Sequence, residues 1–263
     1  MTYTHGHAES VLRSHRARTV ENSAAYLLPH LSSSDRLLDV GSGPGTITAD
    51  LARRVREVVA LEISDEAAEL TRAELGRQGI GHVEVRVGDV QDLDLGDAEF
   101  DVVHAHQVLQ HVADPVAALR EMARVTRPGG VVGVRDSDYA AFAWYPELPG
   151  LERWRDLYRA AARANRGEPD AGRHLLAWAH AAGLEDVAAG SSSWCFATPE
   201  TRAWWGGMWA DRVTGSALAE QLRRDGLAEP GELRALADAW RAWAAHPDGW
   251  ISILHGELVI RVQ

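Results

Sequence analysis

Three glycines close together mark the part of the chain best suited to hold a ligand. Gly41, Gly43 and Gly45 follow the largely apolar run 37–40, and residues typical of a helix come next. Glycine lets the backbone turn tightly and lets a ligand lie against it. The free N–H groups at a helix start add a partly positive surface. The pattern predicts a strand, a ligand-binding turn and a helix in direct succession.

An acidic residue stands at the end of the next apolar run. Glu62 follows the run 58–61, and a carboxylate at a strand end can accept hydrogen bonds from both ribose hydroxyls of a nucleoside cofactor. The glycine spacing departs from the dinucleotide fingerprint, because Thr46 occupies the place of its third glycine. Taken alone, the turn leaves two alternatives open, a purely structural turn and a nicotinamide-nucleotide site.

Further strand-like segments follow in order. Residues 83–90 and 100–106 have the composition of strands, and residues 127–134 that of a turn leading into another strand. In order and spacing this series resembles the class I S-adenosyl-L-methionine (SAM)-dependent methyltransferases, and among them the branch of ubiquinone- and menaquinone-biosynthesis methyltransferases. The resemblance covers residues 15–138 well and the rest loosely, and it implies SAM as the cofactor.

The resemblance also implies where SAM would lie. The glycine turn would pass beneath the methionine part and the ribose, Glu62 would hold the ribose hydroxyls, and Asp89 would accept from the adenine amino group. The fork-shaped guanidinium of Arg18 can clamp the methionine carboxylate, although an arginine on an amphipathic helix can equally be a solvated residue. The expected cofactor contacts are Arg18, Gly41, Ser42, Gly43, Glu62, Ile63, Gly88, Asp89, Val90, His106, Gln107 and His111.

Candidate bases surround the ends of the fourth and fifth strands. Methyl transfer from a sulfonium depends on alignment of the acceptor, and it needs a base only where the acceptor must lose a proton. His106 is the first choice because imidazole titrates near neutral pH, and His104 and Asp136 are the other candidates. Alternation along a strand places His104 and His106 on one face, where a histidine can also be a core residue.

The order of the elements predicts an α/β fold. We expect a Rossmann-like, mostly parallel seven-stranded sheet with helices on both faces. Residues 1–34 form an N-terminal helical extension or lid with a helix over Glu9–Leu31, and residues 35–145 form the SAM-binding core. Residues 146–263 complete the sheet and add a Trp-rich helical substrate cap, inserted between the last two strands. Helices are predicted at 45–56, 65–78, 114–126, 151–165 and 172–182, a strand ends near Phe196, a helical insertion spans 199–246, and a final strand spans 251–262.

The tryptophans are confined to the second half of the chain. All ten lie between Trp144 and Trp250. As a group they predict an apolar wall for a small apolar or aromatic substrate. The alternative for each tryptophan is the core of the helical cap or a dimer contact. We expect a monomer or a homodimer.

Composition narrows the classes of partner. The net charge is −11, and all 27 basic residues are arginine. The lack of a basic block disfavours a nucleic-acid partner. No apolar run approaches the length of a membrane span, so we expect a cytoplasmic protein that does not enter a membrane.

The cysteine and the N-terminal histidines give little sign of special chemistry. The single Cys195 excludes an intrachain disulfide, and we expect it to be a small buried residue of a strand. His5, His7 and His15 lack partners in a recognised ligand spacing, so no metal is expected. The segment from Tyr3 onward can close over SAM and exclude water.

Together these observations favour a SAM-dependent methyltransferase that modifies an O, N or C atom of a small, largely apolar metabolite, such as a quinone-like ring or a natural-product scaffold. One alternative is an enzyme that binds SAM but catalyses a non-methylating reaction, such as a cyclisation or rearrangement. A protein methyltransferase is another alternative. A nicotinamide oxidoreductase is disfavoured by the alternating glycines.

Overall fold

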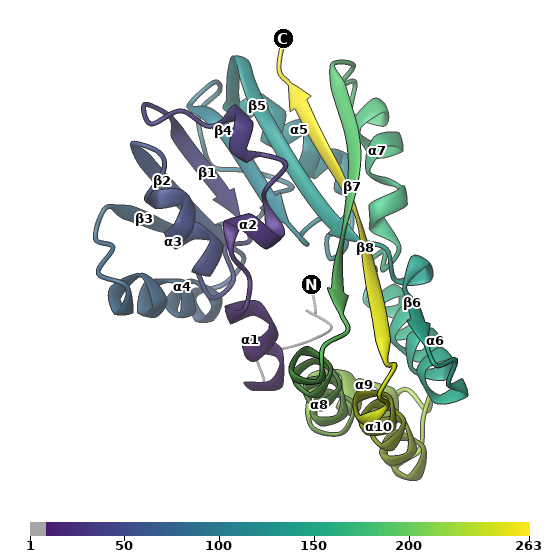
Figure 1. Ribbon diagram of the computed structural model, residues 1–263. Helices are drawn as coiled ribbons and strands as arrows, with labels where there is room; N and C mark the ends of the chain where they lie inside the picture. Colours follow the sequence, from purple (N-terminus) through teal and green to yellow (C-terminus); the bar gives the residue numbers. More distant parts are fainter. Residues whose placement is uncertain (1–8) are drawn as a thin grey trace. The chain divides into compact units, whose positions relative to one another are not determined.

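Runs of valine and leucine alternate with helix-forming segments, and the computed structural model, which describes residues 9–263, shows strands and helices in that alternation (Figure 1). The strands are β1 (Arg36–Val40), β2 (Glu57–Glu62), β3 (Val83–Val87), β4 (Phe100–His106), β5 (Thr126–Ser137), β6 (Ala143–Tyr145), β7 (Val187–Phe196) and β8 (Trp250–Arg261). The α-helices are α1 (Glu9–Arg16), α2 (Val20–Ser23), α3 (Thr46–Ala52), α4 (Asp65–Arg77), α5 (Pro115–Val125), α6 (Pro149–Ala164), α7 (Leu175–Ala181), α8 (Pro199–Gly215), α9 (Ala217–Arg224) and α10 (Pro230–Ala245). Short 3-10 helices are η1 (Leu28–His30), η2 (Tyr139–Ala141) and η3 (Ala171–Arg173).

The chain forms two compact units, each built from separated segments of the sequence. The sheet unit comprises residues 15–137, 171–192 and 255–263. The helical unit comprises the described part of residues 1–14 together with residues 138–170 and 193–254. Elements far apart in the chain therefore meet within each unit.

In the sheet unit the strands lie in the order β3-β2-β1-β4-β5-β8, and β7 pairs with β8. Strands β1 to β5 run parallel, whereas β8 is antiparallel to β5. In the helical unit the short β6 pairs with the first residues of β8. The predicted Rossmann-like α/β sheet is confirmed, and β6 brings the strands of the described residues to eight where seven were expected.

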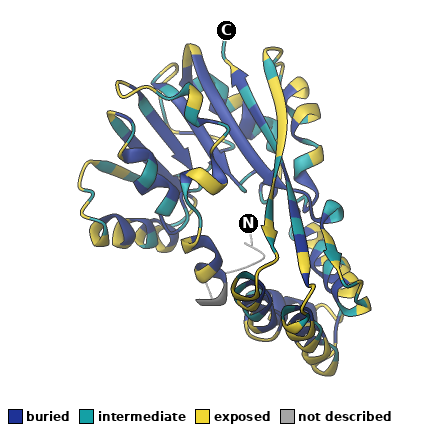
Figure 2. Cartoon of the chain, in the orientation of Figure 1, coloured by how far each residue is buried: buried dark blue, intermediate teal, exposed yellow. Residues whose placement is uncertain are grey.

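Alternate residues of β1 show that helices cover both faces of the sheet. Leu37 belongs to the hydrophobic cluster that α2 and α3 complete with Val20 and Ile47. Leu38 points the other way and belongs to the cluster that α5 completes with Leu119. Figure 2 shows the central strands buried and β7 largely exposed.

The predicted single helix over Glu9–Leu31 is wrong. The chain breaks after α1 and resumes in the short α2, because Thr19 caps the new helix start: its hydroxyl accepts from the Asn22 N–H while the Asn22 side chain accepts from the Thr19 N–H. Pro29 then lies in η1 rather than in an α-helix, as its missing N–H requires.

The helices of the sheet unit agree with the predicted bounds in two cases and differ from them in two others. The bounds of α4 and α5 agree with prediction to within a residue, and Ser64 and Asp114 cap their N-termini with side-chain oxygens. Helix α3 ends earlier than expected, at Ala52. The helix predicted at 172–182 is divided into η3 and α7.

Tryptophans fill the core of the helical unit. Trp154, Trp209, Trp240 and Trp243 are each no more than 1% exposed, and the ring of Trp154 meets those of Trp209 and Trp240 edge to face at 4.5 and 4.8 Å. Helices α6, α8 and α10 supply these rings, and α8, α9 and α10 form the predicted helical insertion between β7 and β8. These four tryptophans follow the alternative of a core for the helical cap and do not line a pocket, because packing with helix neighbours covers them.

Cys195 also differs from expectation. It lies in β7 as predicted, but it is exposed, since this strand pairs with β8 and keeps much of its surface uncovered. Over residues 9–263 the structure has no helix with both the length and the apolar character needed to cross a membrane.

We expect Trp240→Ala to lower the free energy of unfolding by about 3–5 kcal/mol, because a completely buried indole is replaced by a cavity. Trp250→Ala is the matched control, since Trp250 is 40% exposed and its loss should cost less than about 1 kcal/mol. Urea unfolding of the three proteins measures both values. Equal losses for the two variants would contradict the assignment of Trp240 to the core.

Candidate functional site

The loops that follow the parallel strands are fastened to one another at one edge of the sheet. The Gly41 N–H donates to the Leu61 carbonyl at 2.8 Å, and the Gly88 N–H donates to the Glu62 carbonyl at 2.8 Å. Farther along the edge, the Gln107 N–H donates to the Arg135 carbonyl at 2.7 Å. These hydrogen bonds fix where each loop begins relative to its neighbour. The residues after β1, β2, β3 and β4 therefore share the edge of the sheet where open α/β folds bind ligands.

The turn after β1 requires its glycines. Gly41, Gly43 and Gly45 have φ values of +67°, +57° and +86°, in the region that residues with a Cβ avoid. A Cβ on Gly41 would also lie 2.4 Å from a methyl group of Val108, in the loop after β4. At Gly41 the turn therefore packs directly against the loop after β4, at a distance that leaves no room for a side chain.

Glu62 ends β2 with its carboxylate against this turn. The side chain is 8% exposed and accepts from the Gly43 N–H and, at 3.2 Å, from the Ile63 N–H. Ile63 itself is 60% exposed, which is unusual for a large apolar residue and suits a residue that packs on a planar ring. At the end of β3, Asp89 accepts from the Gln91 N–H at 2.9 Å, and Val90 is buried.

A buried carboxylate supports the turn from below. Asp39 is 2% exposed; one oxygen accepts from the Thr48 hydroxyl at 2.6 Å, and the other lies 2.7 Å from His104 Nδ1. Through these contacts β1, β4 and α3 are joined at one point. His104, a candidate base, is completely buried in this network.

His106 lies on the same face of the sheet as His104, as the alternation predicts. In the sheet register, His106 stands opposite Arg135, and Arg135 stands opposite Glu257. These three residues form a row of polar side chains across β4, β5 and β8. Arg135 is 1% exposed and donates to the Glu257 carboxylate at 3.0 Å and to the Ser192 hydroxyl at 3.1 Å. The row continues onto β7 through that hydroxyl.

The environment of His106 favours its neutral form. The ring is only 5% exposed. Burial, followed by the positive charges of Arg18 and Arg135, lowers the pKa of His106 well below its ordinary value. His111 in the next loop is affected in the same way, and burial together with Arg18 lowers its pKa to about 3. Both imidazoles are therefore neutral near pH 7 and keep a lone pair on one ring nitrogen, and the lowered pKa makes each a weaker base than free imidazole.

Asp136 lies on the opposite face of the sheet from these imidazoles. Arg135 shares the face of His106, so the next residue of β5 must point away. Asp136 is completely buried, accepts from the Gln110 N–H at 3.1 Å, and has its pKa raised to about 7 by burial. The structure brings His104 and His106 together but separates Asp136 from both.

A chain of side chains that the sequence did not reveal connects Arg18 to the last strand. Arg18 Nη2 donates to Gln107 Oε1 at 2.8 Å, and Gln107 Nε2 lies 2.9 Å from Nε2 of His255. His255 stands 148 residues beyond Gln107. In the sequence, the alternation of its strand was the one feature that pointed to His255. This residue occupies the inward-facing position that follows those of Ile251 and Ile253.

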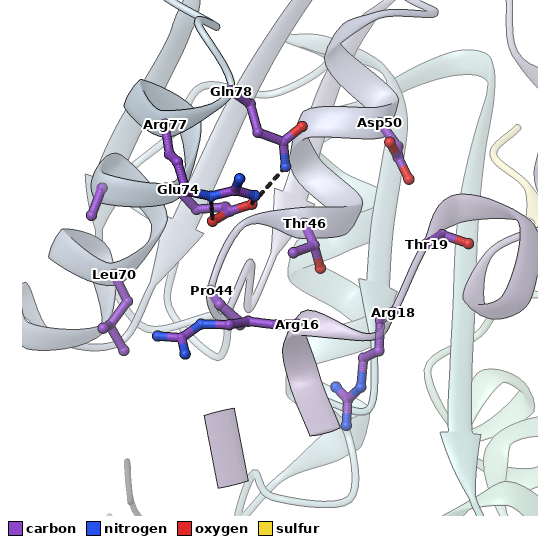
Figure 3. Close-up of a pocket in the computed structure, with 11 residues that line it drawn as sticks. Arg16, Arg18, Thr19, Pro44, Thr46, Asp50, Leu70, Glu74, Arg77 and Gln78 are labelled. Atoms are coloured by element: carbon purple, nitrogen blue, oxygen red, sulfur yellow. Dashed lines mark hydrogen bonds and ion pairs between the residues drawn. The ribbon is translucent and has the colours of Figure 1, made fainter. Parts of the chain in front are cut away.

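Arg18 also borders a cavity of about 520 Å³, lined from the turn between α1 and α2, the start of α3 and helix α4 (Figure 3). Arg16 and Pro44 line it, and Glu74 is held in its wall by Arg77 and Gln78. None of its lining residues except Arg18 is an expected cofactor contact.

The N-terminal residues considered above have different outcomes. The carbonyl of His15 accepts from the Thr46 hydroxyl at 3.3 Å, which fastens the end of α1 to the start of α3. Tyr3, His5 and His7 lie outside the described residues.

A parallel sheet with a bare glycine turn and acidic strand ends defines a Rossmann-like fold for a nucleoside cofactor. The family described as "methyltransferase domain" matches residues 38–134. An uncharacterized methyltransferase of Schizosaccharomyces pombe is 36% identical over 274 residues, which cover 99% of this chain and 96% of the yeast protein. The chain belongs to the class I SAM-dependent methyltransferases, so it is an enzyme and its cofactor is SAM.

Other known proteins are similar to this chain in sequence or in fold. The methyltransferase ltbC of Aspergillus luteorubrus is 28% identical over 98% of this chain and 96% of its own length. The fold also matches a phosphoethanolamine N-methyltransferase of Haemonchus contortus solved with S-adenosylhomocysteine (SAH), with a TM-score of 0.59 and 15% identity over 92% of this chain and 53% of the nematode protein. The [4+2]-cyclase SpnF matches with a TM-score of 0.53 and 23% identity, over 94% of this chain and 80% of SpnF.

We expect Glu62→Ala to weaken SAH binding at least about tenfold, because two ribose hydroxyls lose a charged acceptor. Glu84→Ala is the matched control, since Glu84 is an exposed residue of β3 that pairs with Arg86. Isothermal titration of both variants beside the wild type measures the change. Unchanged affinity in Glu62→Ala would remove this carboxylate from the cofactor site.

The raised pKa of Asp136 predicts a pH-dependent stability. Its folded pKa of about 7 lies above the ordinary value of 3.8. The stabilisation is therefore complete below that ordinary value and is lost as the pH rises through 7. Relative to Asp136→Asn, which keeps an acceptor for the Gln110 N–H, the wild type should lose about 2–3 kcal/mol of unfolding free energy between pH 5 and pH 8. Urea unfolding at both pH values gives the difference, and parallel pH dependence of the two proteins would contradict the shift.

Proposed function

We propose that this methyltransferase moves the SAM methyl group to a small, largely apolar metabolite whose acceptor atom loses a proton during the reaction. The observation that carries the proposal is the imidazole of His106, which ends β4 at the ligand-binding edge in a buried setting that favours its neutral form. An acceptor must be small to bring a reacting atom to so enclosed a base. Hydroxyl groups of aromatic rings and enols fit this requirement, and an acidic C–H or N–H of a quinone-like or natural-product scaffold fits it as well.

In this proposal, residues at the ends of different strands bind different parts of the cofactor. The fit rests on the Glu62 carboxylate, which lies against the glycine turn, and on the exposed side chain of Ile63. Glu62 would accept from the ribose hydroxyls, Asp89 would accept from the adenine amino group, and Arg18 would bind the methionine carboxylate. When bound, SAM supplies an electrophilic methyl group on a positive sulfur.

The proton transfer is assigned to a side chain at the end of β4. His106 would take the proton that the acceptor loses when it receives the methyl group that SAM supplies. General-base assistance of this kind is worth about 10²–10⁴-fold in rate. Alignment of the acceptor beside His106 would contribute a further part of the barrier reduction. Because His104 is completely buried against Asp39, we assign the base to His106.

The alternative reactions differ in their products. An enzyme that uses SAM only for its charge would turn over without forming SAH, and a protein methyltransferase would label polypeptides. The [4+2]-cyclase SpnF shares only the fold, so it does not favour either alternative. Release of SAH with a panel of small catechols and naphthols, compared with a panel of peptides, distinguishes the three functions. Methyl transfer to peptides alone, or turnover of a small molecule without SAH, would overturn the proposal.

We expect His106→Gln to lower kcat about 10²–10⁴-fold, a much larger change than the one in SAH affinity. His180→Gln is the matched control because His180 is an exposed residue of α7. In the wild type, kcat should stay constant as the pH falls from 8 to 6.5, since the lowered pKa of His106 keeps the base unprotonated there. Full turnover in His106→Gln would show that the acceptor needs no base at this position.

A further inference from the structure

We infer that Gln107 is a positioning residue that holds His255 as a neutral imidazole protonated on Nδ1, and so leaves proton acceptance to His106. The inference rests on the proposed function for the part played by His106. Its structural content, the tautomer of His255, stands on hydrogen-bond geometry alone.

The first step is the orientation of the Gln107 amide. Arg18 Nη2 lies 2.8 Å from one end of this amide, and a guanidinium has hydrogens to donate but no site to accept. The end that faces Arg18 must therefore be the carbonyl oxygen. The reversed amide would place two donors against each other, so a single orientation satisfies this contact.

The second step follows at the other end of the same amide. With the oxygen on Arg18, the NH₂ group faces Nε2 of His255 at 2.9 Å. An amide nitrogen only donates, so Nε2 of His255 must supply a lone pair. A neutral imidazole that accepts at Nε2 carries its hydrogen at Nδ1, which fixes the tautomer.

The backbone of Gln107 fixes the point from which this amide extends. Its φ of +56° lies in the left-handed region, which is uncommon for a residue with a side chain. The Gln107 N–H holds that conformation by donating to the Arg135 carbonyl at 2.7 Å. The amide is therefore presented to Arg18 and His255 from a fixed point at the end of β4.

The consequence for the reaction comes from the contact between two imidazoles. His255 is completely buried, and its ring lies nearly parallel to that of His106, with centroids 6.3 Å apart and planes at 26°. Protonation of His255 at Nε2 would set an N–H against the NH₂ of Gln107 and place a positive charge beside His106. Gln107 opposes that protonation, so the stacked pair has one ring that accepts the proton and one that stays neutral.

The experiment is a long-range ¹H–¹⁵N correlation spectrum of the full-length protein labelled with ¹⁵N-histidine, recorded without ligand at pH 7. The spectrum of a His255→Asn variant identifies the His255 signals among the 12 histidines. We expect the Nδ1-protonated tautomer of His255 to exceed the other by at least about tenfold, the preference that one buried hydrogen bond supports. A wild-type His255 protonated on Nε2, or doubly protonated, would overturn the inference.

Gln107→Glu tests the cause of the tautomer. The carboxylate still accepts from Arg18 but has no hydrogen to donate, so His255 should change to a form protonated on Nε2. Wild-type signals from His30 and His180 report that the variant is folded, and a His255 that keeps its tautomer in folded Gln107→Glu would contradict the role of Gln107. These spectra do not depend on turnover. If His106→Gln loses kcat but wild-type His255 is protonated on Nε2, only this inference is refuted. If His255 has the expected tautomer but the protein transfers no methyl group, only the proposed function is refuted.

Discussion

The Asp39 carboxylate is the contact on which the geometry of the site depends most. It is buried beneath the glycine turn, where one oxygen binds Thr48 of α3 and the other binds His104 of β4. A buried carboxylate persists only when its oxygens are satisfied, so α3 and β4 are held at fixed distances from the end of β1. The turn between β1 and α3 then has one path, which requires left-handed glycines and leaves their bare backbone at the sheet edge.

The register of the sheet decides which polar residues meet. His104 and His106 share a face with Arg135 and Glu257 because these residues stand opposite one another or two positions apart. Burying such a row between hydrophobic clusters costs stability unless each charge has a partner, and Arg135 has the Glu257 carboxylate. The same register places Asp136 on the other face, away from the imidazoles.

Much of the fold could be predicted from local pattern, since apolar runs, helix caps at Ser64 and Asp114 and the glycine turn are short-range features. The position of Glu62 at the ligand-binding edge could also be predicted, because parallel strands end at the same edge of the sheet. Long-range packing could not be predicted: a capping box at Thr19 divides the expected N-terminal helix, and tryptophans that could line a pocket form a core instead. His255 escaped notice because its partner, Gln107, lies 148 residues away, and no pattern within one strand points to that contact.

We propose that SAM lies across the ends of β1 to β4 with its reactive sulfur toward the side chain of His106 at the end of β4. A crystal structure of the protein with SAH tests this most directly. We predict ribose hydroxyls on the Glu62 carboxylate, adenine against Ile63, the methionine carboxylate on Arg18 and the sulfur on the side of His106. SAH bound in the cavity beside Arg16 and Glu74, or a sulfur turned away from His106, would contradict the account.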